Sequence, residues 1–515
     1  MFHPVLFGPD GQKLAIQGAW KAARKDRKQT SNWNPGNGSA DDDLLWDLPT
    51  LRNQSRSLQR DNPLAAGAVN TATTSVVGTG LTVQSEIDRE ILGLTTEDAS
   101  AWQAQAERYF NLWAGSKEAD VTLTQNFWEM QDLAFRSTLE SGDALALIAN
   151  IQRPSSICGT SIQIIEGDRI VNKDNMKDTE TLIAGVAIDK VGAPSAYHVL
   201  RNHPGSTIST QKAWDIRPAF TASGRRATLH LFTRTRPGQH RGVPYLATVI
   251  EAFRELGEYT DGELRAAVIS GLFSVFIEPP TTGGGGMLDV PEGEGGPNKE
   301  GELAIDYGTV VNLAPGEKPH NITPGRPNTA FDPFVLAILR QIGVGLEIPY
   351  EILIKHFTAS YSAARAALLE LGKFVRRRRF WLACNFCQPI YEAVIEEFIA
   401  MGILDAPGFF DNVLVRKAYL GTTWIGDSLG QIDPLKEADS WQKLVENRFA
   451  TKTEATAALT GGDYERNVER LAYEEKRERD LGLKDMTATA PAAPAVYPSD
   501  AGAAVSADTT DLETP

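Results

Sequence analysis

Cysteine is scarce in this 515-residue sequence, which holds only Cys158, Cys384 and Cys387. An odd and small number of cysteines excludes a disulfide framework and is typical of a reducing compartment. Cys384 and Cys387 form a Cys-x-x-Cys motif, but a closed zinc site needs four ligands. Because the pair lies in an apolar helical run, we expect these cysteines to pack in the interior.

Catalytic motifs are also missing. The sequence contains no Gly-x-x-x-x-Gly-Lys-Ser/Thr phosphate loop, no His-Glu-x-x-His and no Gly-x-Ser-x-Gly. The glycine run at 283–286 lacks the spacing needed to cradle a phosphate, and the seven histidines do not cluster at metal-ligand spacing. We therefore expect no catalytic residue, no metal and no cofactor, so the chain is not expected to be an enzyme.

Long apolar runs and an excess of positive charge are absent as well. No stretch of about 18 apolar residues predicts a membrane span, and the first residues do not form a secretory signal. The formal net charge is −15. A protein that grips DNA over its whole surface has the opposite sign, because its affinity comes from neutralising phosphates. Local basic runs remain, at 21–28 and at Arg376–Arg379; the first is interpreted as a solvated helix face, with a DNA or partner contact as the alternative.

The periodicity that is present predicts an α+β protein. Residues 1–60 are polar and rich in turn formers, which indicates a flexible N-terminal arm with at most one short helix. Residues 62–87 are predicted as a helix, a turn at Gly78 and Gly80, and a strand; helical spacing follows at 100–116 and 122–141, and the tryptophans and phenylalanines there are expected in the core. A period of two then predicts strands at 144–151, 161–170 and 185–200, and the run at 228–244 closes this mixed α+β region.

Long helices dominate the second half. Apolar stripes predict helices at 245–273 and 331–348, which can pair antiparallel, and a helix at 362–401 with a kink at Pro389. Between the first two helices, residues 281–302 are so glycine-rich that we expect a mobile loop. Capping signals at Asp433-Pro434, Thr451–Glu454 and Asp463 predict C-terminal helices. The tail at 486–515 is of low complexity and is expected to be disordered.

A short loop that carries Lys355, His356, Phe357 and Tyr361 separates the second of these helices from the third. A subunit with such long striped helices cannot close into one compact ball. Its stripes favour packing against copies of itself, and head-to-tail contacts of this kind can close into a ring.

In this arrangement the sequence resembles the lambda family of bacteriophage portal proteins over roughly residues 60–480. The segments that carry the resemblance are RDNPLAAGAVNTATTSVVGTGL, GVAIDKVGAPSAYHVL, HLFTRTRPGQHRGVPYLATVI, LEIPYEILIKHFTASYSAARAALLE and DPLKEADSW. The resemblance implies a portal-type multi-domain subunit. Its implied parts are a flexible arm (1–60), an α+β wing (61–244), a first stem helix (245–273), a clip (274–330) with the glycine-rich loop, a second stem helix (331–348), a tunnel loop (349–361), a long wing helix (362–402), the wing end and helical crown (403–485, the crown at 433–482) and a disordered tail (486–515).

The resemblance also implies a function. A portal is a ring, usually a dodecamer, at one vertex of the capsid, through which double-stranded DNA is packaged and ejected. The implied partners are the chain itself, the major capsid protein, a scaffold, the large terminase subunit, a head–tail adaptor and weakly held DNA, with no membrane. The implied location is the virion, after assembly in the host cytoplasm.

Two groups of residues are candidates for that function. The tunnel loop would face the channel with Lys355, His356, Phe357, Thr358, Ser360 and Tyr361, the cations making weak phosphate contacts and the aromatics acting as steric bumpers. Alternatively, Phe357 and Tyr361 pack inside the subunit and Lys355 is merely solvated. The run Arg376, Arg377, Arg378 and Arg379 is interpreted as an inter-subunit ion-pair surface, or as a DNA contact; its members point in different directions on a helix.

Other classes of function compete with a portal. A nuclease of the packaging apparatus would need clustered carboxylates for a divalent metal, and the sequence has none at convincing spacing. A minor capsid protein would not form a ring with a central hole. Electron microscopy of the purified protein separates the three.

Overall fold

The computed structural model describes residues 28, 30–207, 212–271, 275–278, 318–321, 330–357, 360–430 and 433–483. The chain divides into two compact units, Met1–Pro434 and Leu435–Pro515, which are described separately below. The first holds the sheets and most of the helices. The predicted mixture of helix and sheet is confirmed.

The N-terminal part differs from the prediction. Residues 40–60 are not a flexible arm, because they form α1 (Ala40–Leu45) and most of α2 (Leu48–Asp61). A capping box between Ser39 and Asp42 starts α1. Leu48, Arg52 and Ser55 of α2 are buried, and burial of an arginine requires a partner that sequence spacing does not reveal. The basic run at 21–28 lies outside the described residues except for Lys28.

The aromatic core of the first unit forms between helices, as predicted. The helices are α3 (Pro63–Val76), α4 (Arg89–Leu92), α5 (Thr96–Gly115) and α6 (Phe127–Ser141). Phe110 of α5 packs edge-on against Phe127 of α6 at a ring-centroid distance of 5.6 Å and against Tyr391 at 5.2 Å. Trp113 is fully buried and donates its indole N–H to the Thr160 carbonyl, so its polar atom is satisfied within the core.

The described residues of this unit form four antiparallel sheets, one of which is the pair of β9 (Val275–Glu278) and β10 (Lys318–Asn321) between two helices described below. Of the other three, one has the order β3-β2-β8, another β4-β5-β6-β7, and the third pairs β1 with β11. Their strands are β1 (Thr82–Ser85), β2 (Asp143–Asn150), β3 (Thr160–Glu166), β4 (Leu182–Ile183), β5 (Val186–Ile188), β6 (Pro194–Leu200), β7 (Trp214–Pro218), β8 (Thr228–Phe232) and β11 (Thr422–Ile425). The β1–β11 pairing joins segments 343 residues apart in register, from Thr82 opposite Ile425. It ties the C-terminal end of this unit to its N-terminal helices.

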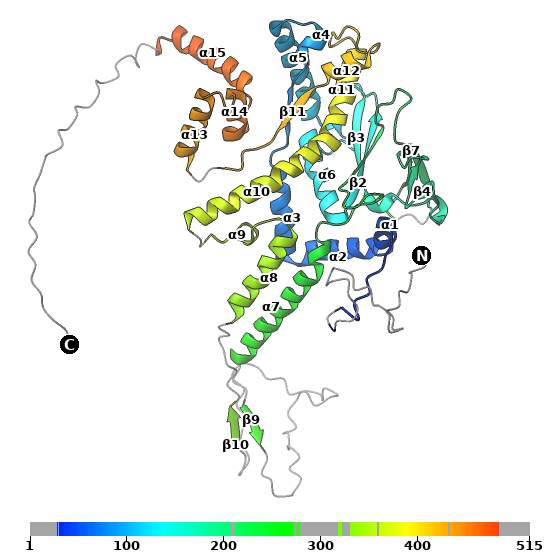
Figure 1. Ribbon diagram of the computed structural model, residues 1–515, viewed down its shortest axis with the longest axis vertical. Coiled ribbons are helices and arrows are strands. Elements are labelled where there is room, and N and C mark those ends of the chain that lie inside the picture. Colours follow the sequence, from blue (N-terminus) through cyan, green and yellow to red (C-terminus); the bar gives the residue numbers. More distant parts are fainter. Residues whose placement is uncertain are drawn as a thin grey trace, which may run out of the picture. The chain divides into compact units, whose positions relative to one another are not determined.

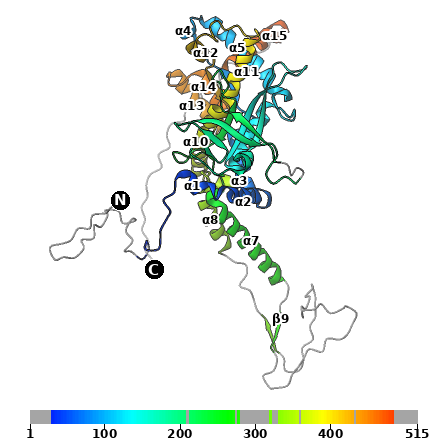
Figure 2. The same cartoon turned by 90° about the vertical axis from the view of Figure 1, so that its right-hand side faces the viewer.

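Two helices, α7 (Ile250–Gly271) and α8 (Phe331–Gly345), lie side by side and project from the rest of this unit (Figures 1 and 2). The predicted helix at 245–273 begins later than expected, at Ile250, after a 3₁₀ turn at Ala247–Val249. The predicted helix at 331–348 ends earlier, at Gly345. Tyr259 of α7 holds the pair together by packing on Phe331 and Phe334 of α8. Between the helices, β9 (Val275–Glu278) pairs antiparallel with β10 (Lys318–Asn321), and the glycine-rich segment 281–302 lies outside the described residues.

The predicted long helix is present but interrupted. It consists of α10 (Tyr361–Leu382), a π-helical turn (Ala383–Cys387) and α11 (Gln388–Ala400). Pro389 has no N–H and its ring conflicts with the carbonyl four residues earlier. A π-helical turn before the proline accommodates its ring. The helix is therefore irregular at 383–387 and not at Pro389 itself. A short helix, α9 (Tyr350–Leu353), precedes α10, and α12 (Val413–Tyr419) follows α11.

The second unit contains α13 (Pro434–Glu446), α14 (Lys452–Thr460) and α15 (Tyr464–Asp480). The capping box of Thr451 and Glu454 and the N-cap of Asp463 are confirmed. None of these three helices has a buried residue.

Gly142, which ends α6 in the first unit, lies close to the backbone of Gly242, and this close approach can be tested. Its φ is +87°, and a Cβ there would lie 2.4 Å from the Gly242 carbonyl oxygen. Gly192 in the β5–β6 turn has φ +83° but no atom within 4 Å of such a Cβ. We expect Gly192→Ala to cost about 1 kcal/mol from backbone strain alone, and Gly142→Ala to cost at least about 2 kcal/mol more from the added clash. Urea unfolding of both variants measures the difference, and equal costs would contradict the close approach.

Candidate channel surface and subunit interface

The segment between α8 and α10 is anchored at its middle and exposed at its end. Ile352 and Leu353 of α9 are buried in the core. Glu347 and Lys355, on either side of α9, adopt positive φ values of 56° and 54°, which are unfavourable for residues with a Cβ. Such backbone strain persists only where surrounding contacts hold it, and here buried α9 supplies them.

Beyond that anchor, the predicted loop residues are exposed in the single chain. Lys355 and His356 are exposed, and Phe357 and Tyr361 leave 59% and 48% of their surface accessible. The alternative in which both aromatics pack inside their own subunit is therefore wrong. Ser360 occupies the N-cap position of α10 without a side-chain cap bond. Thr358 lies outside the described residues.

Two of the four consecutive arginines point into their own chain. Arg379 donates from Nε to the Val76 carbonyl at 2.8 Å and from Nη2 to the Ser75 carbonyl at 3.1 Å, which caps the C-terminus of α3. The guanidinium of Arg378 lies over the rings of Tyr245 and Phe374, with its carbon 5.9 and 5.4 Å from their centroids. Burial lowers the pKa of both arginines from their usual high value.

The interpretation of the whole run as an interface or DNA contact is therefore wrong for Arg378 and Arg379. Successive helical residues point about 100° apart, so two members face the body of the chain and two face away. Arg376 is exposed, and Arg377 makes an exposed ion pair with Glu347 at 3.4 Å. Only Arg376 and Arg377 are available to another molecule.

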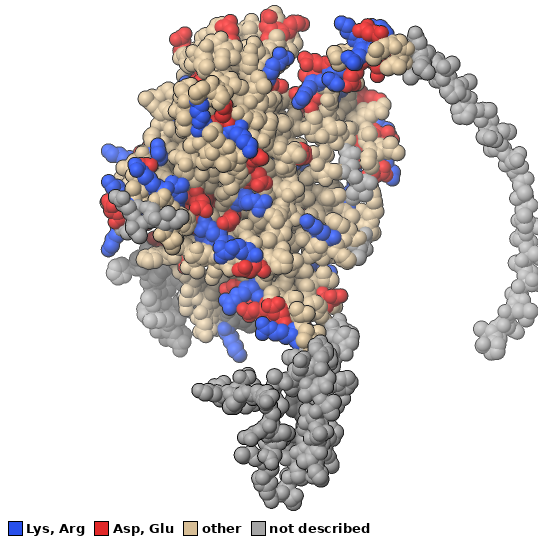
Figure 3. Space-filling view, turned by 180° about the vertical axis from the view of Figure 1, so that it is seen from behind, with Lys and Arg blue, Asp and Glu red and all other residues tan. Residues whose placement is uncertain are grey.

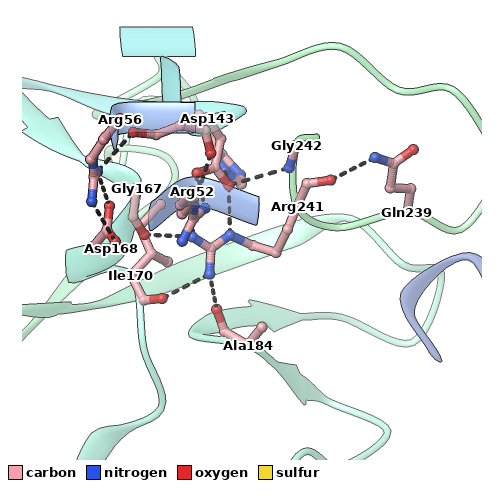
Figure 4. Close-up of polar contacts among 12 residues, drawn as sticks. Arg52, Arg56, Asp143, Gly167, Asp168, Ile170, Ala184, Gln239, Arg241 and Gly242 are labelled. Carbon is pink, nitrogen blue, oxygen red and sulfur yellow. Dashed lines mark hydrogen bonds and ion pairs between the residues drawn. The ribbon is translucent and has the colours of Figure 1, made fainter. Parts of the chain in front are cut away.

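A buried charged cluster holds the start of α7 to the sheets (Figure 4). Asp143, the first residue of β2, is fully buried and binds Arg52 Nη2 at 2.5 Å and Arg241 Nε at 2.6 Å. Arg52 also donates to the Ser141 carbonyl. Arg241 reaches the carbonyls of Gly167, Ile170 and Ala184. The two guanidiniums hold the pKa of the Asp143 carboxyl well below its usual range, against the opposing effect of its own burial.

Two further groups complete this cluster. His230 of β8 lies with Nε2 3.2 Å from Asp143 Oδ2, and burial, helped by the charges of Arg241 and Arg52, lowers its pKa against the opposing effect of Asp143. Arg56 of α2 pairs with Asp168 and, at 3.0 Å, with Glu140. Sequence reasoning missed the whole cluster because its charged pairs join residues 84 to 112 positions apart and follow no short-range pattern.

The chemistry available to these residues is binding and positioning. Cys387 is buried and Cys384 exposed, so the packing prediction is confirmed for Cys387 only. Burial raises the pKa of both thiols, which disfavours the reactive thiolate. Within the described ranges no group of three or more His, Cys, Asp and Glu side chains is arranged to hold a metal ion. None of the helices among these residues is long and apolar enough to cross a membrane.

Comparison with known proteins gives the class of the chain. The family described as phage portal protein, lambda family, matches residues 26–379. The portal protein of Escherichia phage N15 is 26% identical over 507 residues, which cover 93% of this chain and 94% of that protein. Portal protein B of Escherichia phage lambda is 26% identical over 504 residues, with the same coverage. Among solved structures, the neck of a native gene transfer agent particle is 13% identical, covers 80% of this chain and 93% of its own, and superposes with a TM-score of 0.41.

The match over most of the chain places it among the phage portal proteins. Within that class it belongs to the lambda family, as its resemblance to the family indicated. It is accordingly a component of the virion that forms the channel at one vertex of the capsid, and it works there as a homo-oligomer.

The different roles of the four arginines can be measured. Arg379→Ala removes two hydrogen bonds from a charged donor to buried carbonyls, so we expect the free energy of unfolding to fall by about 1–3 kcal/mol. Arg376→Ala, on the exposed side, is the matched control and is expected to stay within about 0.5 kcal/mol of the wild type. Chemical denaturation of the unassembled chain gives both values. A stable Arg379→Ala variant would mean that these bonds do not form.

The cluster around Asp143 predicts how stability depends on pH. In the unfolded chain His230 takes up a proton near its ordinary pKa of about 6.5, whereas the folded pKa is lowered, so the unfolded state binds more protons below that value. Stability should therefore fall as the pH drops from about 7 to about 5, by up to about 1.4 kcal/mol per pH unit for each such histidine. The pKa of His198 is also lowered by burial, and it adds to the effect.

Asp143 does not contribute in that window, because a carboxyl with a depressed pKa loses its contribution only at much lower pH. His230→Gln, compared with His198→Gln and the double variant, separates the two histidines in denaturation curves between pH 5 and 7. If His230→Gln leaves the slope unchanged, the imidazole is not held neutral by this cluster.

Proposed function

We propose that the chain is a non-catalytic conduit for double-stranded DNA, and that the exposed end of the 346–361 segment lines the bore. The observation that carries this proposal is the exposure of Lys355, His356 and Phe357 immediately after a buried anchor. A cation and an imidazole on a surface loop make weak, salt-screened phosphate contacts. Because buried α9 anchors the segment, the exposed side chains after it can contact passing DNA without displacement of the backbone.

The same proposal assigns parts to the chain. The α7–α8 pair is the stem, the segment between these helices is the clip that docks the terminase motor, α10 and α11 form the long wing helix, and the second unit is the crown. On the projecting part of the pair, Leu264 and Val268 of α7 and Phe334 of α8 are 65%, 51% and 49% exposed. Apolar exposure of this kind favours cover by neighbouring copies, which supports a closed ring; the number of twelve copies is what the family resemblance implies.

Charge supports loose contact with DNA. Each copy adds a formal −15, so the assembled ring repels phosphates on average. On the face shown in Figure 3, Lys and Arg side chains alternate with Asp and Glu over a largely uncharged surface, with no continuous basic track. Adhesion of DNA outside the bore is therefore disfavoured, and the few cations of the loop act against this background.

Removal of the loop tip tests the assignment. We expect deletion of residues 357–360 to leave rings intact in electron micrographs but to reduce the length of DNA packaged or retained per particle. Phe357→Ala with Tyr361→Ala is the milder variant, and Phe380→Ala, an exposed aromatic elsewhere on α10, is the control. Full packaging and normal retention in the deletion variant would show that the loop does not face the bore.

A further inference from the structure

A pocket of about 340 Å³ in the first unit, away from the α7–α8 pair, carries an excess of positive charge. It lies between the turn that joins β7 to β8, the start of α11 and the end of α12. We call it the arginine pocket, defined by its charged residues Arg225, Arg226, Glu392, Glu396, Arg416 and Lys417. All belong to the described residues of one compact unit.

Arg225 is incomplete in the single chain. Its Nε and Nη1 atoms are buried without a hydrogen-bond partner. The nearest carboxylate oxygen, Glu396 Oε2, lies 3.7 Å from Nε, which is too far for a hydrogen bond. The turn that carries Arg225 is fixed by the Thr221 N–H bond to its carbonyl, so its backbone is held in place. A buried charged donor without an acceptor is costly, and native structures complete such groups.

The contacts of the other charged residues do not neutralise the excess of positive charge in the pocket. Lys417 already pairs with Glu392 at 3.3 Å. Arg226 lies over the Phe220 ring at 5.2 Å, and the Arg416 guanidinium makes no ion pair or hydrogen bond within the described part of the chain. Four cations therefore face two carboxylates, in a chain whose acidic residues outnumber its basic ones by 66 to 51. The pocket is built for an additional anion.

The shape and the resident carboxylates favour a protein anion over DNA. The volume admits one or two side chains, but a duplex carries its phosphates on a broad, stiff surface. Glu392 and Glu396 would repel a row of phosphates but tolerate a single carboxylate. The Arg225 guanidinium still has donors without a hydrogen-bond acceptor, and charge-assisted bonds from such donors to a carboxylate are the strong ones.

We propose that the arginine pocket binds an Asp or Glu side chain presented by the neighbouring copy in the ring. The inference rests on ring assembly, and it adds a specific ion-pair site to that interface. In a closed ring of identical subunits each contact joins two different patches of the same chain, so every pocket has the same neighbour. Arg225, whose one ion pair within its own copy is the long contact with Glu396, then gains a further carboxylate in every copy of the ring.

Zero-length cross-linking provides a direct test. A carbodiimide couples the Lys417 amine to carboxylates in contact with it. Rings co-assembled from ¹⁴N- and ¹⁵N-labelled chains distinguish links within a copy from links between copies in mass spectra. We expect mixed-isotope peptides that join Lys417 to one Asp or Glu. Links only within a copy, such as Lys417 to Glu392, would overturn the proposal.

Substitution of Arg225 provides the second test. For Arg225→Gln we expect the chain concentration at half-assembly to rise about tenfold, the equivalent of one charge-assisted pair, with partial rescue by Arg225→Lys. Thermal unfolding of the unassembled chain should change little, because the long, part-exposed pair of Arg225 with Glu396 contributes little within one copy. Arg108→Gln, at an exposed position of α5, is the control. An equal loss of stability in the unassembled Arg225→Gln chain would show a role within the subunit and overturn the proposal.

A fluorescently labelled short DNA duplex tests the alternative that the arginine pocket binds DNA. We expect its fluorescence anisotropy titration to be the same for wild type and Arg225→Gln; a clear loss of DNA affinity in the variant would assign the pocket to DNA instead. A wild-type chain that forms no ring would contradict the proposed conduit itself. A wild-type ring without the mixed-isotope link contradicts only the pocket.

Discussion

The carboxylate of Asp143 is the group on which the rest of the first unit depends. It is fully buried, and it is bound by Arg52 from α2 and by Arg241 from the segment that leads into α7. The cost of burying these charges is offset because all three nitrogens of the Arg241 guanidinium, and Nε and Nη2 of Arg52, donate to Asp143 or to carbonyls around it. The cluster thus fixes the N-terminal helices and the origin of α7 against the sheets. The direction in which the α7–α8 pair leaves the body is set there.

A different principle governs the surfaces. The single chain leaves apolar side chains exposed on the projecting helices, and it leaves Arg225 with buried donors that make no hydrogen bond. A monomer that functioned alone would gain nothing from either feature. In a ring the neighbouring copy covers such groups at every interface, so their cost in the free chain becomes part of the driving force for assembly. The buried contacts determine the fold of the single subunit. The exposed apolar side chains and Arg225 favour association with further copies.

The sequence predicted what depends on local pattern. Periodic helices, alternating strands and the caps at Thr451 and Asp463 were readable because neighbours a few residues apart determine them. The helix at Leu48–Asp61 was missed, because its apolar stripe is only Leu48, Leu51 and Leu58 in a polar stretch and its buried face is completed by Asp143, 91 residues from Arg52. The four arginines show the same limit. Their spacing indicated that they point apart, but only the fold shows that Arg379 meets the end of α3.

In the conduit proposed above, loose contact with DNA places opposite demands on the loop between α9 and α10. Many cations would hold DNA in place, because each phosphate contact adds to the affinity. A fully mobile loop would yield to the duplex and exert no influence on its passage. The loop meets both demands with few charges and a buried base. Lys355 supplies one cation and His356 one imidazole. Buried Ile352 and Leu353 hold the strained backbone that precedes them. Because α10 begins directly after this loop, a force on the tip is transmitted along a helix whose far end is bound to α3 through Arg379. Contact with the cargo and the packing of the subunit are thereby linked through one helix.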